Sequence, residues 1–241
     1  MDKKAKIAII ALICLNIISY IFSFVLLLQI NSLRKKDICI NSYISMVAKM
    51  HAEFNSTEFY SNATAFLIDD KGHLLTNFHS ISHQNDYGEY DLSNIISIQF
   101  PDEEEIHIAN VVDYDIQKDI AILHYDNCNK DGIYSFSIDA NFGEDCYFIG
   151  NTNNIGISVS KGIISIPSVL VEVDGLMQEY VQSNIDIYPG SSGGCLINKN
   201  GEIIGMAAFR LKDKLGNPIS GYGYFIPSKV LTSFINYQEI F

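Results

Sequence analysis

The chain opens with an apolar run unlike anything that follows it. Residues 7–30 read IAIIALICLNIISYIFSFVLLLQI and contain no charged side chain. At ~1.5 Å per residue a helix of this length measures roughly 36 Å, enough to cross the hydrocarbon core of a membrane with some tilt. We therefore interpret residues 1–36 as a single-pass membrane anchor with basic flanks.

A cleaved signal peptide is the alternative interpretation of this segment. Its apolar part is usually about 7–15 residues long and ends at a cleavage site of small residues. Here the run is longer, and the INSLRKK that follows has no such site. Three basic residues precede the run and three follow it, so charge alone does not orient the anchor.

The pattern after the anchor changes twice. Residues 38–54 carry apolar side chains at intervals of three or four, which predicts a helical linker over 37–58. From residue 59 on, short apolar runs alternate with turn signals such as DDKGH and NKNGE, which is typical of an all-β fold. A polar break near residue 130 divides these strands into two groups. We predict two barrels, over about 59–130 and 131–230, in a domain that ends with a helix at 227–240.

Composition removes several classes of function. The chain has 28 Asp and Glu against 16 Lys and Arg, a net charge of −12, and no basic stripe that would neutralise phosphates, so we expect no nucleic-acid partner. The negative net charge favours solubility, and the substrates that it could attract are cationic ones. Five cysteines without a C-x-x-C pair indicate neither a zinc site nor a disulfide scaffold. Whether Cys128 and Cys146 pair stays open.

The stretch DIYPGSSGGCLINKNGEIIGM, residues 186–206, is the first candidate for chemistry. Glycines on both sides of the two serines allow backbone conformations that a Cβ would forbid. Such a turn exposes a side chain and aims backbone N–H groups into one cavity, as an acyl-transfer nucleophile with an oxyanion hole requires. A plain Gly/Ser hairpin turn is the alternative.

A serine nucleophile needs a neutral imidazole as base and a carboxylate to hold its tautomer. His79 ends the apolar strand in LLTNFHSI, and Asp119 directly precedes the apolar IAIL, whereas Asp113 and Asp115 are typical of solvated turns. His83 follows His79 at a spacing that suits a metal on a helix, but this segment is not helical in pattern and no third ligand follows. We expect no metal and no cofactor.

Five motifs occur in a fixed order and resemble those of trypsin-like serine proteases, in particular the HtrA/Deg group. They are TNFH at 76–79, DIAIL at 119–123, FIGN at 148–151, PGSSGG at 189–194 and GYGYFIP at 221–227. The resemblance covers about residues 63–230. It implies an all-β, chymotrypsin-like fold of two six-stranded antiparallel barrels, with serine endopeptidase activity on peptide or unfolded protein substrates. It also favours an extracytoplasmic protease domain.

The resemblance assigns roles to individual residues. His79 matches the general base, Asp119 the orienting acid, and Ser192, not Ser191, the nucleophile. The backbone N–H groups of Gly190 and Ser192 match the oxyanion hole.

Two positions depart from the family pattern. SNATAF replaces the usual Gly-Ser-Gly before the first apolar strand, and Cys195 stands where Pro commonly follows Ser-Gly-Gly. Neither removes a catalytic group, and no PDZ domain is expected after the protease module.

Two functions are alternatives to a membrane-anchored serine endopeptidase. One is a catalytically silent module that binds peptides or acts as a sensor, and the other is a freely diffusing secreted protease.

Substrate preference depends on Asp186, six residues before Ser192, where trypsin has the acid of its specificity pocket. At the pocket floor, Asp186 would select Lys or Arg before the cleaved bond; as a loop residue, it would leave an apolar preference. The expected substrate-binding residues besides Asp186 are Gly205, Ala207, Ala208, Gly221 and Gly223.

Overall fold

A computed structural model describes residues 2–33, 40–55, 59–130 and 135–237. The chain separates into two units, residues 1–37 and 38–241. In the first unit, helix α1 spans Lys3–Leu33. Among the residues that the structure describes, no helix is both long and apolar enough to cross a membrane. The expected transmembrane helix is therefore not confirmed.

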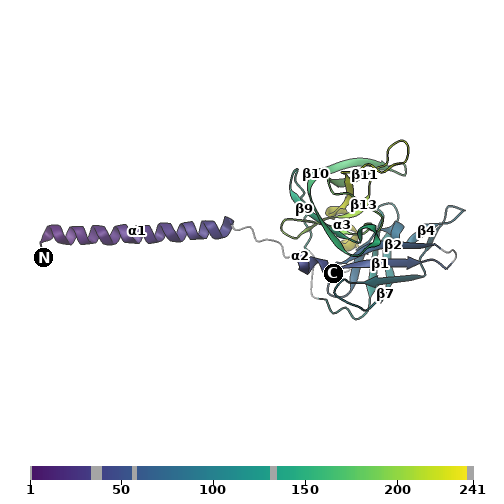
Figure 1. Ribbon diagram of the computed structural model, residues 1–241, viewed down its shortest axis with the longest axis horizontal. Coiled ribbons are helices and arrows are strands. Elements are labelled where there is room, and N and C mark those ends of the chain that lie inside the picture. The colour runs from purple at the N-terminus through teal and green to yellow at the C-terminus, as the bar shows by residue number, and fades with distance from the viewer. Residues whose placement is uncertain (1, 34–39, 56–58, 131–134, 238–241) are drawn as a thin grey trace. The chain divides into compact units, whose positions relative to one another are not determined.

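The first barrel is a closed sheet of six antiparallel strands in the order β1-β2-β3-β8-β7-β6 (Figure 1). Its strands are β1 (Val47–Glu53), β2 (Tyr60–Leu67), β3 (His73–Thr76), β6 (Ile95–Gln99), β7 (His107–Asp115) and β8 (Ile120–Tyr125). Between β3 and β6 lie the 3-10 turn η1 (Phe78–Ser80) and a small two-stranded sheet of β4 (Ser82–Gln84) and β5 (Tyr90–Leu92).

The second barrel is also closed and six-stranded, in the order β10-β11-β14-β13-β12-β9. Its strands are β9 (Asp145–Gly150), β10 (Ser158–Val173), β11 (Leu176–Ser183), β12 (Cys195–Asn198), β13 (Ile203–Phe209) and β14 (Gly223–Pro227). The 3-10 turn η2 (Thr152–Asn154) follows β9, and helix α3 (Ser228–Tyr237) follows β14. Two six-stranded barrels and a C-terminal helix are thus confirmed, although residues 238–240 of the expected helix lie outside the described residues.

The predicted helical linker over 37–58 is wrong. Among its described residues, 40–55, only the short helix α2 (Ile40–Ile44) is helical, and Val47–Glu53 forms β1, which pairs with both β2 and β6. Met50 and Ala52 point into the barrel, whereas Lys49 between Ala48 and Met50 is exposed. Apolar spacing over so short a stretch fits either period, and pairing on both edges decides for the strand. The first barrel therefore begins at residue 47 and not at 59.

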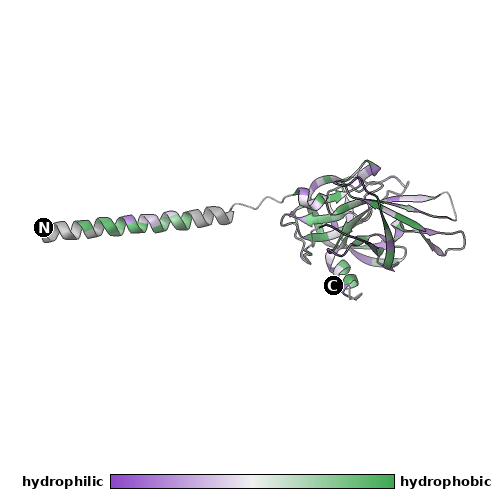
Figure 2. Cartoon of the chain, turned by 90° about the horizontal axis from the view of Figure 1, so that it is seen from below, coloured by the Kyte–Doolittle hydropathy of each residue, from purple (hydrophilic) through white to green (hydrophobic). Residues whose placement is uncertain are grey.

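Strand β8 shows how the core fixes the residues next to it. Ile120, Ala121, Ile122 and Leu123 are each 0% exposed, so this strand is buried on both faces. Figure 2 shows apolar and polar residues distributed over the strands of both barrels. Pairing on both edges shows the register of β8: Ala121 lies opposite Thr76 of β3, and Ile120 lies opposite Asp115 of β7. The residue that precedes β8 is Asp119.

Candidate active site

The turn between β11 and β12 places the two serines in different surroundings. Gly190 and Gly193 adopt φ values of 87° and 80°, in the region that side chains disfavour. A Cβ on Gly193 would also collide with the carbonyl oxygen of Thr64. Ser191 is fully buried, and its hydroxyl accepts a hydrogen bond from the Tyr188 N–H at 3.3 Å. Ser192 is partly exposed, so only the second serine is open to a substrate.

His79 lies on η1, directly after β3, and faces Ser192. Its Nε2 is 3.0 Å from the Ser192 hydroxyl, although the two residues are 113 positions apart in the sequence. Half of the imidazole surface is exposed. The structure therefore brings together a strand end of the first barrel and a turn of the second.

Asp119 holds His79 through both carboxylate oxygens. Oδ1 accepts the backbone N–H of His79 at 2.9 Å, and Oδ2 lies 2.7 Å from its Nδ1. Because the carboxylate accepts a hydrogen bond from Nδ1–H, the neutral ring keeps Nε2 unprotonated and directed at Ser192. Asp119 itself adopts a left-handed φ of 55°, and its carbonyl accepts a hydrogen bond from the Asn77 side chain at 3.0 Å. Neither Asp113 nor Asp115 approaches His79; Asp115 pairs with Lys118 at 2.7 Å.

Asp119 also sets the basicity of His79. Desolvation by partial burial lowers the pKa of His79, but the charge of Asp119 and the hydrogen bond to it raise the pKa by more. The net result is a pKa above the ordinary value of 6.5. The imidazole is therefore a stronger base than a free histidine side chain, and it requires a higher pH to become neutral.

The backbone N–H groups of Gly190 and Ser192 donate no hydrogen bond within the described part of the chain. The neighbouring carbonyls are all occupied: Thr64 donates its hydroxyl to the Gly190 oxygen at 2.7 Å and its N–H to the Ser192 oxygen at 2.8 Å. The Asn153 N–H binds the Pro189 oxygen at 2.8 Å. Since C=O and N–H of a trans peptide point in opposite directions, the Gly190 N–H points away from Asn153.

Asp186 is hydrogen-bonded to the loop that precedes β14 and to a nearby tyrosine. One carboxylate oxygen accepts the Gly221 N–H at 2.6 Å, and the other accepts the Tyr188 hydroxyl at 3.4 Å. The guanidinium of Arg210 lies 4.9 Å from the centre of the Tyr188 ring. The carboxylate is thus partly buried and already hydrogen-bonded.

The other expected pocket residues lie on β13, on β14 and just before β14. Ala207 pairs with Phe225, and its carbonyl accepts the Gly193 N–H at 3.3 Å. Gly223 approaches the carbonyl of Ile185 so closely that a Cβ would collide with it. Gly205 pairs with Leu196 and Pro227, farther along β13 from the Ser192 turn, while Ala208 is buried.

Sequence reasoning missed the residues that brace the turn. Thr64 on β2 bonds the turn through its hydroxyl and its N–H, and Asn153 on η2 holds the Pro189 carbonyl. Asn77, which instead supports Asp119 through its carbonyl, did lie in a motif, TNFH. Thr64 and Asn153 act through contacts between distant segments, and the sequence pattern around them does not reveal such contacts.

The cysteines add no chemistry to this site. Cys14, Cys128, Cys146 and Cys195 are free thiols, and Cys39 lies outside the described residues. Cys128 accepts a hydrogen bond from the Tyr125 hydroxyl, and burial raises the pKa of Cys146 to about 11. Cys128 and Cys146 are therefore not paired in this structure.

The fold and this geometry agree with what comparison shows. A model of the trypsin-like peptidase domain matches residues 63–206, so the chain belongs to this family. The periplasmic serine endoprotease DegP of Escherichia coli strain K12 is 32% identical over 181 residues, 72% of this chain and 35% of that protein. The serine endoprotease DegS of the same strain is 27% identical over 187 residues, 76% of this chain and 49% of that protein.

Solved structures point to the same group. An HtrA-type protease, AlgW with a tripeptide, matches 82% of this chain and 61% of that chain, with a TM-score of 0.67 and 26% identity. The expected resemblance to the HtrA/Deg group is confirmed. The chain spans about a third of the length of DegP and about half of the length of DegS.

Proposed function

We propose that this protein is a serine endopeptidase in which Ser192 is the nucleophile, His79 the general base and Asp119 the orienting acid. The observation that carries the proposal is the unbroken line of hydrogen bonds from Asp119 through His79 to the partly exposed Ser192 hydroxyl. Such a line moves a proton off serine while keeping the imidazolium next to a carboxylate.

The reaction follows from the positions of these groups. The Ser192 oxygen attacks the carbonyl carbon of a peptide bond, and His79 Nε2 takes the hydroxyl proton. The N–H groups of Gly190 and Ser192 stabilise the negative oxygen that develops on the substrate. His79 then returns the proton to the leaving amine, which leaves an acyl group on Ser192. A water molecule, activated by the same imidazole, releases the acid.

Incubation with an unfolded protein tests the proposal. An endopeptidase generates internal peptides with new N-termini, which mass spectrometry identifies. The alternative, a catalytically silent peptide-binding module, predicts binding of the same substrate without new termini. The intact line of hydrogen bonds favours cleavage.

We propose a preference for small apolar residues before the cleaved bond. The support is the state of Asp186, whose carboxylate already accepts hydrogen bonds from Gly221 and Tyr188. These two hydrogen bonds use part of the acceptor capacity of the carboxylate and tie it to the Gly221 loop, which leaves less of it free for a substrate cation. A buried, unpaired carboxylate would instead attract Lys or Arg and disfavour apolar side chains.

Profiling on one peptide library decides between these preferences. We expect wild type to cleave after Val, Leu or Ala, and Asp186→Ala to keep that preference with lower activity because the Gly221 loop loses its anchor. Asp186→Asn, which retains an acceptor without the charge, should stay closer to wild type. Cleavage by wild type after Lys or Arg, shifting to apolar residues in Asp186→Ala, would establish the basic-pocket interpretation instead.

We further infer that residues 1–36 attach the protease domain to a membrane and that the domain is extracytoplasmic. The inference rests on the uncharged run at 7–30, and the periplasmic location stated for DegP accords with it. We expect the full chain to sediment with membranes, to keep its N-terminal lysines and to expose the catalytic domain to added external protease. Recovery of a soluble form that begins near residue 31 would show a cleaved signal peptide.

A further inference from the structure

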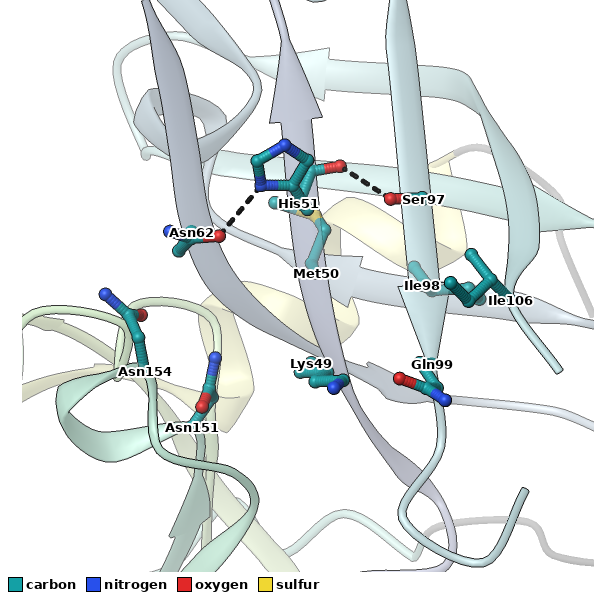
Figure 3. Close-up of a pocket in the computed structure, with 10 residues that line it drawn as sticks. All are labelled: Lys49, Met50, His51, Asn62, Ser97, Ile98, Gln99, Ile106, Asn151 and Asn154. Atoms are coloured by element: carbon teal, nitrogen blue, oxygen red, sulfur yellow. Dashed lines mark hydrogen bonds between the residues drawn. The ribbon is translucent and has the colours of Figure 1, made fainter. Parts of the chain in front are cut away.

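A cavity lies outside the proposed catalytic groups, on the outer face of the first barrel. It has a volume of about 360 Å³, within the range of small-ligand sites. Strands β1, β2 and β6 form most of its wall, and Asn151 and Asn154 of the second barrel close one side (Figure 3). Its ten lining residues include no Asp or Glu, although the chain has 28 of them.

The cavity offers a cation that has no partner in the described part of the chain. Lys49 is exposed on β1 and, like Lys71, Lys199, Lys212 and Lys214, forms no ion pair with the described residues. The acid nearest along β1, Glu53, lies beside His51 at 3.5 Å instead.

Two amides in the wall have occupied acceptors and unused donors. The side-chain oxygen of Asn62 lies 2.8 Å from His51 Nδ1, and that of Asn151 accepts the Gly156 N–H at 3.0 Å. The NH₂ groups of both donate no hydrogen bond within the described residues. Together with the Lys49 ammonium they form a wall of donors, which suits a ligand that only accepts hydrogen bonds and carries negative charge.

We propose that this cavity binds a carboxylate, either the C-terminus of a short peptide or a small free acid. Lys49 supplies the charge, and the amide groups of Asn62 and Asn151 supply neutral donors on the side of β2 and the second barrel (Figure 3). A cleaved peptide carries a new C-terminal carboxylate, so products of the proposed reaction have the required chemistry.

The same wall supports the turn that carries Ser192. The Asn151 N–H donates to the Thr64 hydroxyl at 2.8 Å, and that hydroxyl donates to the Gly190 carbonyl. Two residues later, the Asn153 N–H holds the Pro189 carbonyl. Asn151 therefore belongs both to the wall of the cavity and to the hydrogen bonds behind the Ser192 turn.

Binding is tested without activity, on the full chain carrying Ser192→Ala. Calorimetric titrations compare N-acetyl-dialanine with its C-terminal amide and with acetate. We expect the peptide acid to bind and the amide not to bind. Comparable affinity for acetate would identify a free acid as sufficient, whereas much tighter binding of the peptide acid would identify a peptide C-terminus.

Variants of Lys49 locate the binding. Lys49→Met should weaken affinity by about ten-fold or more, because a charged hydrogen bond is lost, while Lys49→Arg retains it. Lys161→Met removes an exposed lysine elsewhere and should have no effect. The proposal is overturned if acid and amide bind alike, if neither binds, or if Lys49→Met and Lys161→Met behave identically, which would place the peptide elsewhere.

Discussion

Ser192→Ala is expected to reduce the rate of peptide hydrolysis by about 10⁴–10⁶-fold, because removal of the nucleophile from a Ser-His-Asp set leaves only the contribution of the oxyanion site and binding. The Ser192 hydroxyl is the partly exposed one, 3.0 Å from His79 Nε2. Steady-state kinetics on a peptide that the wild type cleaves gives the ratio directly.

Ser191→Ala is the matched control for this substitution. Ser191 is fully buried, and its hydroxyl lies 3.5 Å from the Thr152 hydroxyl and accepts the Tyr188 N–H. Its loss removes a contact within the turn but no reacting group, so we expect most of the activity to remain. An active Ser192→Ala beside a silent Ser191→Ala would mean that the nucleophile is the other serine.

Asp119→Asn is expected to reduce the rate of hydrolysis by about 10⁴-fold without unfolding the protein, because an amide in place of the carboxylate favours the wrong tautomer of His79. The amide NH₂ would face Nδ1, and the ring proton would move to Nε2, where it blocks transfer from Ser192. Asp113→Asn, on the same segment but away from His79, should retain activity. The assignment of the acid fails if Asp119→Asn is as active as wild type.

The pH dependence of hydrolysis is a second test of the role of Asp119. Hydrolysis requires neutral His79, so activity should rise with pH through a midpoint above 6.5, the ordinary value that Asp119 raises. In Asp119→Asn both raising effects are lost, while desolvation still lowers the pKa. The midpoint of the residual activity should therefore move to lower pH. A midpoint that stays in place would show that Asp119 does not act on the imidazole.

Much of the fold was predictable because strand patterns and turns are local. The run at 120–123 is apolar without interruption, and its complete burial in β8 explains why the acid before it is held in place. Strand β1 was missed for the opposite reason. Its few apolar residues fit a helical spacing as well as a strand, and only pairing with β2 and β6 decides between them.

The residues of the candidate site also fall into two groups: those that a local motif predicts and those that depend on contacts between distant segments. His79, Asp119 and Ser192 lie in short motifs, and the structure brings them into one line of hydrogen bonds. The left-handed conformation of Asp119 has no signal in its sequence. The braces from Thr64 and Asn153 arise where the two barrels meet, and a pattern along one strand carries no information on its neighbour in the other barrel.

The central claim is that Ser192 is an activated nucleophile, and covalent labelling tests it most directly. The full chain is treated with a fluorophosphonate, and the modified residue is identified by mass spectrometry of its peptides. We predict one adduct, on Ser192, in the wild type, and none in Ser192→Ala or His79→Ala. Folded wild-type protein that forms no adduct, or an adduct on Ser192 that persists at the same rate in His79→Ala, would contradict the account.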